Sequence, residues 1–150
     1  MREKSFSGGV AQAISRSFIE NGGYVCSCHF QNGQFEFQVT NSVSDLREFR
    51  DSKYVKSDPK SCYSDIVRVL KDFNTKLLFI GLPCQAAAVR NYVGDKYKEK
   101  LYTIDLICHG TPSVKVLKHF LEDHELDIEE LKKIRFRQKG RFVVEGEMSL

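Results

Sequence analysis

Hydrophobic positions in the first half of the chain follow first a helical and then a strand period. From Gly8 to Asn21, apolar residues recur every three or four positions, which predicts an amphipathic helix that ends at Gly22-Gly23. From Tyr24 to Val39, apolar and polar residues alternate on both sides of Asn32-Gly33, a pair that favours a tight two-residue turn. This stretch therefore predicts a β-hairpin. A second amphipathic helix is expected from Tyr63 to Phe73.

The second half contains two successive strand-turn-helix units. An uninterrupted apolar run from Leu77 to Ile80 is typical of a strand buried on both faces of a parallel sheet, and a helix is expected from Gln85 to Val93. The pattern recurs as a strand from Leu101 to Ile107 and a helix from Ser113 to about Asp123. Such units call for right-handed crossovers. We therefore predict an α/β fold, a partly parallel mixed sheet with flanking helices and β-hairpins, the last hairpin turning at residues 138–140.

Length and composition narrow the class of protein. A chain of 150 residues suits one domain, so residues 1–150 are expected to form a single α/β domain. With 29% charged residues, no run approaches the ~20 apolar residues that a membrane helix needs. The net charge of +3 is too small to indicate nucleic-acid binding. The start of the chain lacks a signal-peptide core, so we expect a cytoplasmic protein whose five cysteines are free or bound to metal.

Two cysteines follow the two predicted strands at equivalent positions, Cys84 after the first and Cys108 after the second. In a parallel sheet, the loops that leave the carboxyl ends of the strands line the crevice where ligands bind. If the two strands are neighbours, these cysteines lie side by side, each near a helix N-terminus that favours the thiolate. Such a pair can bind a metal or cluster, form a disulfide or redox pair, or consist of two small buried thiols. The pattern leaves these alternatives open.

His109 directly follows Cys108, so its imidazole could donate a proton, contact a cofactor or bind metal. A further alternative makes Cys84 a nucleophile with His109 as its base. The segment from Lys4 to Gly9 leads into the first helix, where backbone N–H groups and the lysine could hold a phosphate.

The remaining cysteines and His29 are given structural roles. Cys26 and Cys28 point to the same side of their strand as Tyr24 and Phe30, so both are expected to be buried beside these aromatic residues. Cys62, at the start of a helix, is interpreted as an inert or partly exposed thiol. His29 points away from the cysteine side and is expected to be an ordinary surface residue.

Several stretches together form a recognisable series. The specific ones are Leu77 to Gln85, which ends in Gly-Leu-Pro-Cys-Gln, and Leu101 to Ser113, which contains Asp-Leu-Ile-Cys-His-Gly-Thr-Pro-Ser. Lys4 to Val10, Ser52 to Ser57 and Phe136-Arg137 support them. In this order, the stretches resemble the coenzyme F420 hydrogenase/dehydrogenase beta-subunit family. The resemblance implies an iron-sulfur flavoprotein subunit that binds FAD and relays electrons between the flavin, a four-iron cluster and a redox partner. In members that use a deazaflavin, hydride passes between coenzyme F420 and FAD.

The resemblance also implies roles for individual residues. Cys84 and Cys108 would be two ligands of a 4Fe-4S cluster whose ligand set is incomplete in this chain, and His109 would be catalytic. The implied cofactor-binding residues are Lys4, Ser7, Gly8 and Gly9 for a phosphate, and Lys53, Tyr54, Ser57, Pro83, Gln85 and Gly110 around the flavin.

The chain departs from the family pattern in places. Leu82 stands where the family form Gly-Thr-Pro-Cys has threonine. Relatives often carry a ferredoxin-like segment with clustered cysteines before this region and more cysteines after it. We therefore expect a fragment of a longer flavin/iron-sulfur oxidoreductase subunit that is inactive alone, works with a redox partner protein or ferredoxin-like segment, and could form homo-oligomers. The alternative is a non-enzymatic α/β module that binds a partner and has lost its cofactors.

Overall fold

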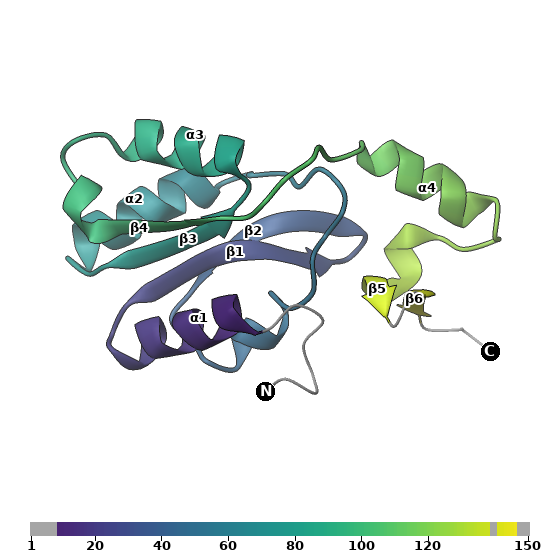
Figure 1. Ribbon diagram of the computed structural model, residues 1–150, viewed down its shortest axis with the longest axis horizontal. Helices are drawn as coiled ribbons and strands as arrows, with labels where there is room; N and C mark the ends of the chain where they lie inside the picture. Colours follow the sequence, from purple (N-terminus) through teal and green to yellow (C-terminus); the bar gives the residue numbers. More distant parts are fainter. Residues whose placement is uncertain (1–8, 139–140, 147–150) are drawn as a thin grey trace.

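A mixed four-stranded sheet forms the centre of the computed structural model, which describes residues 9–138 and 141–146 (Figure 1). The strand order is β2-β1-β3-β4, with β1 at Tyr24–Gln31, β2 at Gln34–Thr40, β3 at Leu77–Gly81 and β4 at Leu101–Asp105. β1 pairs antiparallel with β2, and β3 pairs parallel with both β1 and β4. The predicted α/β class with a partly parallel sheet is confirmed.

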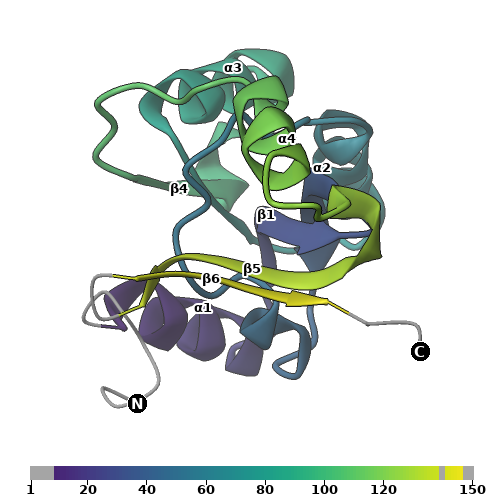
Figure 2. The same ribbon diagram turned by 90° about the vertical axis from the view of Figure 1, so that its right-hand side faces the viewer.

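Helices cover both faces of this sheet (Figure 2). On one face lie α1 (Val10–Glu20) and the short 3₁₀ helix η2 (Asp45–Arg47). On the other face lie α2 (Cys62–Asp72) and α3 (Pro83–Val93), and η3 (Lys98–Lys100) leads into β4. No helix in the described ranges combines the length and the apolar character needed to cross a bilayer.

The β1–β2 hairpin closes through the predicted two-residue turn. Asn32 and Gly33 have positive φ angles of 49° and 73°, as the favoured hairpin turn of this length requires. Gln31 and Gln34 pair directly across it. The turn therefore fixes the register that places Cys26 and Cys28 on the face covered by α2 and α3.

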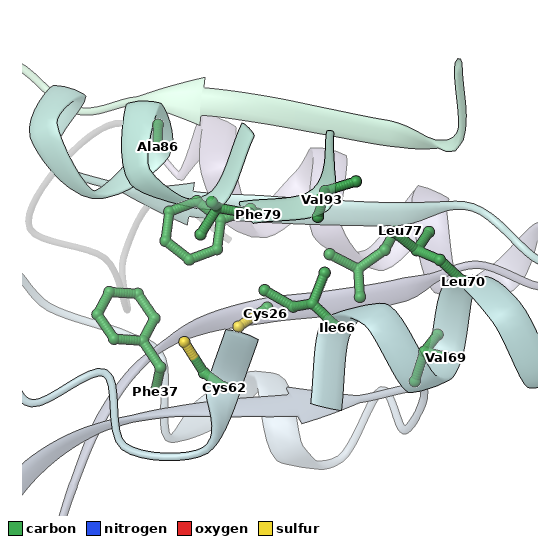
Figure 3. Packing of buried hydrophobic residues seen from close by; sticks show 11 residues of the cluster. Cys26, Phe37, Cys62, Ile66, Val69, Leu70, Leu77, Phe79, Ala86 and Val93 are labelled. Carbon is green, nitrogen blue, oxygen red and sulfur yellow. The ribbon is translucent and has the colours of Figure 1, made fainter. Parts of the chain in front are cut away.

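The main core lies between the sheet and the helices α2 and α3 (Figure 3). All five residues of β3 are buried, as its uninterrupted apolar sequence predicts for a strand covered on both faces. Phe79 of β3 stacks on Phe37 of β2 with ring centroids 5.1 Å apart. Leu78 and Ile80 point to the opposite face and pack with Ile19 of α1.

The C-terminal part packs beyond the end of the β1–β2 hairpin (Figure 1). It comprises α4 (Val114–Glu122), the 3₁₀ helix η4 (Ile128–Glu130) and an antiparallel hairpin of β5 (Leu131–Gln138) and β6 (Arg141–Gly146). Leu121 is fully buried there in a cluster that includes Phe30 and Phe35 of the hairpin. The predicted terminal hairpin is confirmed; of the predicted turn at residues 138–140, residues 139 and 140 lie outside the described residues.

The two element boundaries next to Cys84 and Cys108 differ from the predicted ones by two residues. β4 ends at Asp105, and Leu106 and Ile107, expected in the strand, are exposed residues of the following loop. α3 begins two residues early, at Pro83, because proline suits the first position of a helix and the Gln85 side chain accepts a hydrogen bond from the Leu82 N–H at 2.9 Å. Cys84 therefore belongs to the first turn of α3.

Candidate functional site

The carboxyl ends of the three parallel strands lie at one edge of the sheet. Ser27 of β1 pairs with Ile80 of β3, and Gly81 pairs with Asp105 at the end of β4. The Leu106 N–H donates to the Gly81 carbonyl at 2.8 Å, so the segments that follow β3 and β4 stay together one residue beyond β4. The loops after β3 and β4 consequently leave the sheet side by side, at the edge where ligands of parallel sheets bind.

The start of α3 is built around Gln85. Its side-chain oxygen accepts the Leu82 N–H, and its Nε2 donates to the Ser57 Oγ at 2.9 Å. A Cβ at Gly81 would lie 3.1 Å from that same Gln85 oxygen, so only glycine leaves the amide undisturbed. The structure thus joins Ser57 and Gln85, which come from two separate stretches of the family resemblance.

The loop that carries Ser57 is attached to the other loops at this edge. The Lys56 N–H donates to the Pro112 carbonyl at 2.9 Å, which connects it to the loop after β4. The Asp58 N–H donates to the Phe35 carbonyl at 2.8 Å, which connects it to β2. Tyr54 is 48% exposed and contacts Phe136 of β5 edge to face, with ring centroids 5.9 Å apart. The loop after β4, the strands β2 and β5 and the start of α3 therefore meet the loop at residues 53–58.

Cys28 is a residue of this region that the sequence interpretation missed. It lies near the end of β1, and its thiol is half-buried, donates to the His29 carbonyl at 3.6 Å and also interacts with the Ser57 hydroxyl. Because the Ser57 hydroxyl oxygen accepts from Gln85, its hydrogen is available to the Cys28 sulfur. Burial raises the pKa of the Cys28 thiol, and nearby Lys53 and the Ser57 hydrogen bond partly offset that rise. The sequence signal that could have identified Cys28 as a site residue was its position near the carboxyl end of a predicted strand of the parallel sheet.

Lys53 brings a positive charge close to Cys28, which interacts with Ser57. Its Nζ donates to the carbonyls of Glu48 at 3.1 Å and Arg50 at 2.6 Å. Burial lowers the pKa of Lys53 to about 8, and the negative charges of Asp51 and Glu48 only partly counteract this. A half-buried amine with a depressed pKa gains from an approaching anion, because the anion favours the cationic form.

Cys84 and Cys108 are both exposed free thiols at this edge. Cys84 lies close enough to Tyr63 of α2 to contribute to the raised pKa of that phenol, after burial and Cys62. Cys108 accepts a hydrogen bond from the Gly110 N–H at 3.3 Å, and Gly110 has a φ of 112° that favours glycine. His109, which lies between Cys108 and Gly110 in the sequence, is exposed. Within the described part of the chain, no three His, Cys, Asp or Glu side chains are arranged to hold a metal ion.

Two expectations about exposure differ from the structure. Cys62, expected to be an inert or partly exposed thiol, is only 1% exposed and contacts Cys26, because the first turn of α2 packs onto β1. Partial exposure is therefore wrong, and inertness stays a prediction. His29, expected at the surface, is 8% exposed, because the face of β1 opposite the cysteines is also covered. Burial lowers the pKa of His29.

The proposed phosphate segment is described only at its end. Lys4, Ser7 and Gly8 lie outside the described residues. Gly9 precedes α1 with a φ of 76°, and its carbonyl accepts the Ala13 N–H at 2.9 Å. The role of this segment remains a prediction.

The sequence and the fold both relate this chain to known proteins. Residues 74–149 match the family model for coenzyme F420 hydrogenase/dehydrogenase, at the C terminus of its beta subunit. The chain is also similar to a chain of a solved structure, described as the xenon derivatization of the F420-reducing [NiFe] hydrogenase complex from Methanosarcina barkeri. The identity is 25% and the TM-score 0.67, over 97% of this chain and 53% of that chain. The chain thus spans about half the length of this relative. A comparison with curated proteins found no match.

Proposed function

The chain belongs to the coenzyme F420 hydrogenase/dehydrogenase beta-subunit family, and from this we propose that it takes part in flavin-dependent electron transfer within an oxidoreductase. The solved relative is part of an F420-reducing hydrogenase complex, which supports a role beside partner subunits. We propose FAD as the cofactor, a redox partner protein or ferredoxin-like segment as the electron partner, and coenzyme F420 as a candidate hydride carrier.

The chemistry of the residues at the carboxyl edge fits a flavin dinucleotide. A bound FAD would supply reversible uptake of hydride and electrons. Lys53 would neutralise an anionic phosphate group, and its depressed pKa of about 8 would rise as the anion approached. Gln85 and Ser57 hold each other in place, so the second Nε2–H of Gln85 would meet a ligand without further ordering of the side chain.

Other residues at this edge would shield and orient the cofactor. Ile107 is 92% exposed in the loop after β4, an unusual exposure for an isoleucine that a bound ring system would reduce. Tyr54 offers an exposed aromatic face. His109 remains the candidate proton donor, and Pro83 and Gly110 shape the two loops.

A four-iron cluster does not fit the described residues on their own. Such a cluster takes four thiolates, whereas Cys84 and Cys108 are two exposed thiols with different described neighbours. We therefore derive no step through a cluster. Ligation by these two cysteines requires ligands from outside this chain and stays a prediction.

One observation carries the proposal: the hydrogen bond between Ser57 and Gln85, beside Lys53, at the carboxyl edge of the sheet. Flavin fluorescence during titration of FAD with the protein at pH 7 tests it. Lys53→Gln should weaken binding about tenfold or more, the loss expected when a charge-assisted contact is removed. Gln85→Leu should weaken it by a similar factor.

The matched control is Lys56→Gln in the same loop. The Lys56 side chain is exposed, and among the described residues only its backbone N–H has a hydrogen-bond partner, so this variant removes the same charge without touching Lys53, Ser57 or Gln85. Equal weakening by Lys53→Gln and Lys56→Gln would mean general electrostatic attraction and would contradict the site. A protein that binds no FAD would instead favour the partner-binding module without cofactors.

A further inference from the structure

The sulfur atoms of Cys26 and Cys62 meet inside the main core, away from the carboxyl edge. Figure 3 shows the two side chains pointing toward one another, one from β1 and the other from the first turn of α2. They are 0% and 1% exposed, and their side chains are hydrogen-bonded. Ile66 and Phe79 belong to the same apolar cluster.

The two thiols are chemically unequal. Cys26 donates its hydrogen to the Cys62 sulfur, which lowers the pKa of Cys62, whereas burial raises the pKa of Cys26 well above its ordinary value. Cys62 is also the first residue of α2, where the helix dipole favours a thiolate. One sulfur is therefore the better nucleophile, and the other is in place to react second.

We propose that Cys26 and Cys62 form a dithiol centre that hydrogen peroxide oxidises to a disulfide bond between β1 and α2. The Cys62 thiolate attacks one peroxide oxygen, the O–O bond breaks, and a sulfenic acid forms as the hydroxide that leaves becomes water. The Cys26 sulfur then attacks the Cys62 sulfur, the S–O bond breaks and a second water leaves with the thiol proton. Both thiols together lose two electrons and two protons, and one peroxide takes them up to become two waters.

Their contact makes the bond geometrically accessible. A disulfide requires Cβ atoms close together and side chains directed at each other, and these two side chains are hydrogen-bonded and point toward one another. Cys28, the next cysteine on the same face of β1, interacts with the His29 carbonyl and the Ser57 hydroxyl instead. The bond would link positions 36 residues apart and attach the start of α2 to the sheet. This inference does not depend on flavin binding.

Peroxide treatment of the folded protein followed by mass spectrometry tests the proposal. The background is the Cys84→Ser/Cys108→Ser variant, which removes the two exposed thiols. Trypsin then yields one peptide from Ser17 to Arg47 and another from Ser61 to Arg68. Oxidised protein should contain these two peptides joined, with a loss of two hydrogens. The melting temperature should rise by about 5–10 °C, because the bond restricts the unfolded chain.

Because the first peptide contains both Cys26 and Cys28, matched variants must identify the partner. The joined peptides should persist in Cys28→Ser and disappear in Cys26→Ala and in Cys62→Ala. Joined peptides that persist in Cys26→Ala and disappear in Cys28→Ser would assign the bond to Cys28 and overturn the proposal. Peptides that join only in denaturant, and not in the folded protein, would overturn it as well.

Discussion

A methyl group added at Gly81 is predicted to destabilise the protein through a direct clash in the core. Gly81 ends β3 and is buried, and a Cβ built there would lie 2.7 Å from Cε1 and 2.9 Å from Cζ of Phe79. Phe79 cannot easily give way, since it is 1% exposed and stacked on Phe37. The backbone at Gly81 is outside the left-handed region, so the clash is the source of strain in Gly81→Ala.

The expected cost follows from two opposing effects. Overpacking a well-filled core costs about 1–3 kcal/mol. Replacing glycine by alanine restricts the unfolded chain and returns about 0.4–1 kcal/mol. We therefore expect Gly81→Ala to lower the free energy of unfolding by about 1–2 kcal/mol, and the urea midpoint by about 0.5–1 M.

Urea denaturation followed by circular dichroism measures this loss, and a double-mutant cycle assigns it to the clash. Phe79→Leu removes the ring atoms that the new methyl group would meet. In the Phe79→Leu background, adding Gly81→Ala should be neutral or slightly stabilising. The coupling free energy between the two positions should then be about 1–2 kcal/mol.

Two results would refute this reasoning. A Gly81→Ala protein at least as stable as the parent would mean that the Phe79 ring moves aside without cost. An equal loss in the presence and absence of the Phe79 ring would place the effect elsewhere, for example at the Gln85 oxygen, which lies 3.1 Å from the new Cβ. FAD titration of the single variant would then separate stability from site geometry.

Two further predictions concern single groups. The Lys53 amine should titrate near its lowered pKa of about 8 in NMR spectra of the lysine side chains. Because the unfolded state keeps this proton up to about 10.5, the free energy of unfolding should rise with pH between these two values. Titration near 10.5 in the folded protein would contradict the burial of this amine. Ser113→Ala should lower the free energy of unfolding by about 1 kcal/mol in urea denaturation, because the Ser113 Oγ accepts the Lys115 N–H at the start of α4. A change within ~0.3 kcal/mol would mean that this helix cap contributes nothing to stability.

The regular elements were predictable because their patterns are local. The alternation around Asn32-Gly33 determines a hairpin and its register, and the apolar run at 77–80 indicates a strand buried on both faces. Parallel pairing of β3 with β4 followed from two successive strand-turn-helix units. These inferences require only neighbouring residues and the handedness of connections.

The composition of the candidate site was less accessible, because it depends on a loop without periodicity. Residues 51–59 reach the carboxyl edge through two backbone hydrogen bonds, from Lys56 to Pro112 and from Asp58 to Phe35. Neither bond leaves a signal in the sequence, since any residue other than proline could donate it. The resemblance to the family identified Ser57 and Gln85 as separate residues, whereas the structure shows that they bond to each other and that Cys28 joins them.

The three inner cysteines show why burial depth cannot be inferred from alternation alone. Cys26 and Cys28 share one face of β1, and alternation predicts that face but not what covers each position along the strand. The first turn of α2 covers Cys26 with Cys62, while the loop before α2 brings Ser57 to Cys28. A shift of two residues along one strand therefore separates a thiol closed inside the core from one that borders the candidate cofactor site. Because the segment that leads to Cys62 also carries Ser57, oxidation of the buried pair and occupation of the edge would act on the same piece of chain.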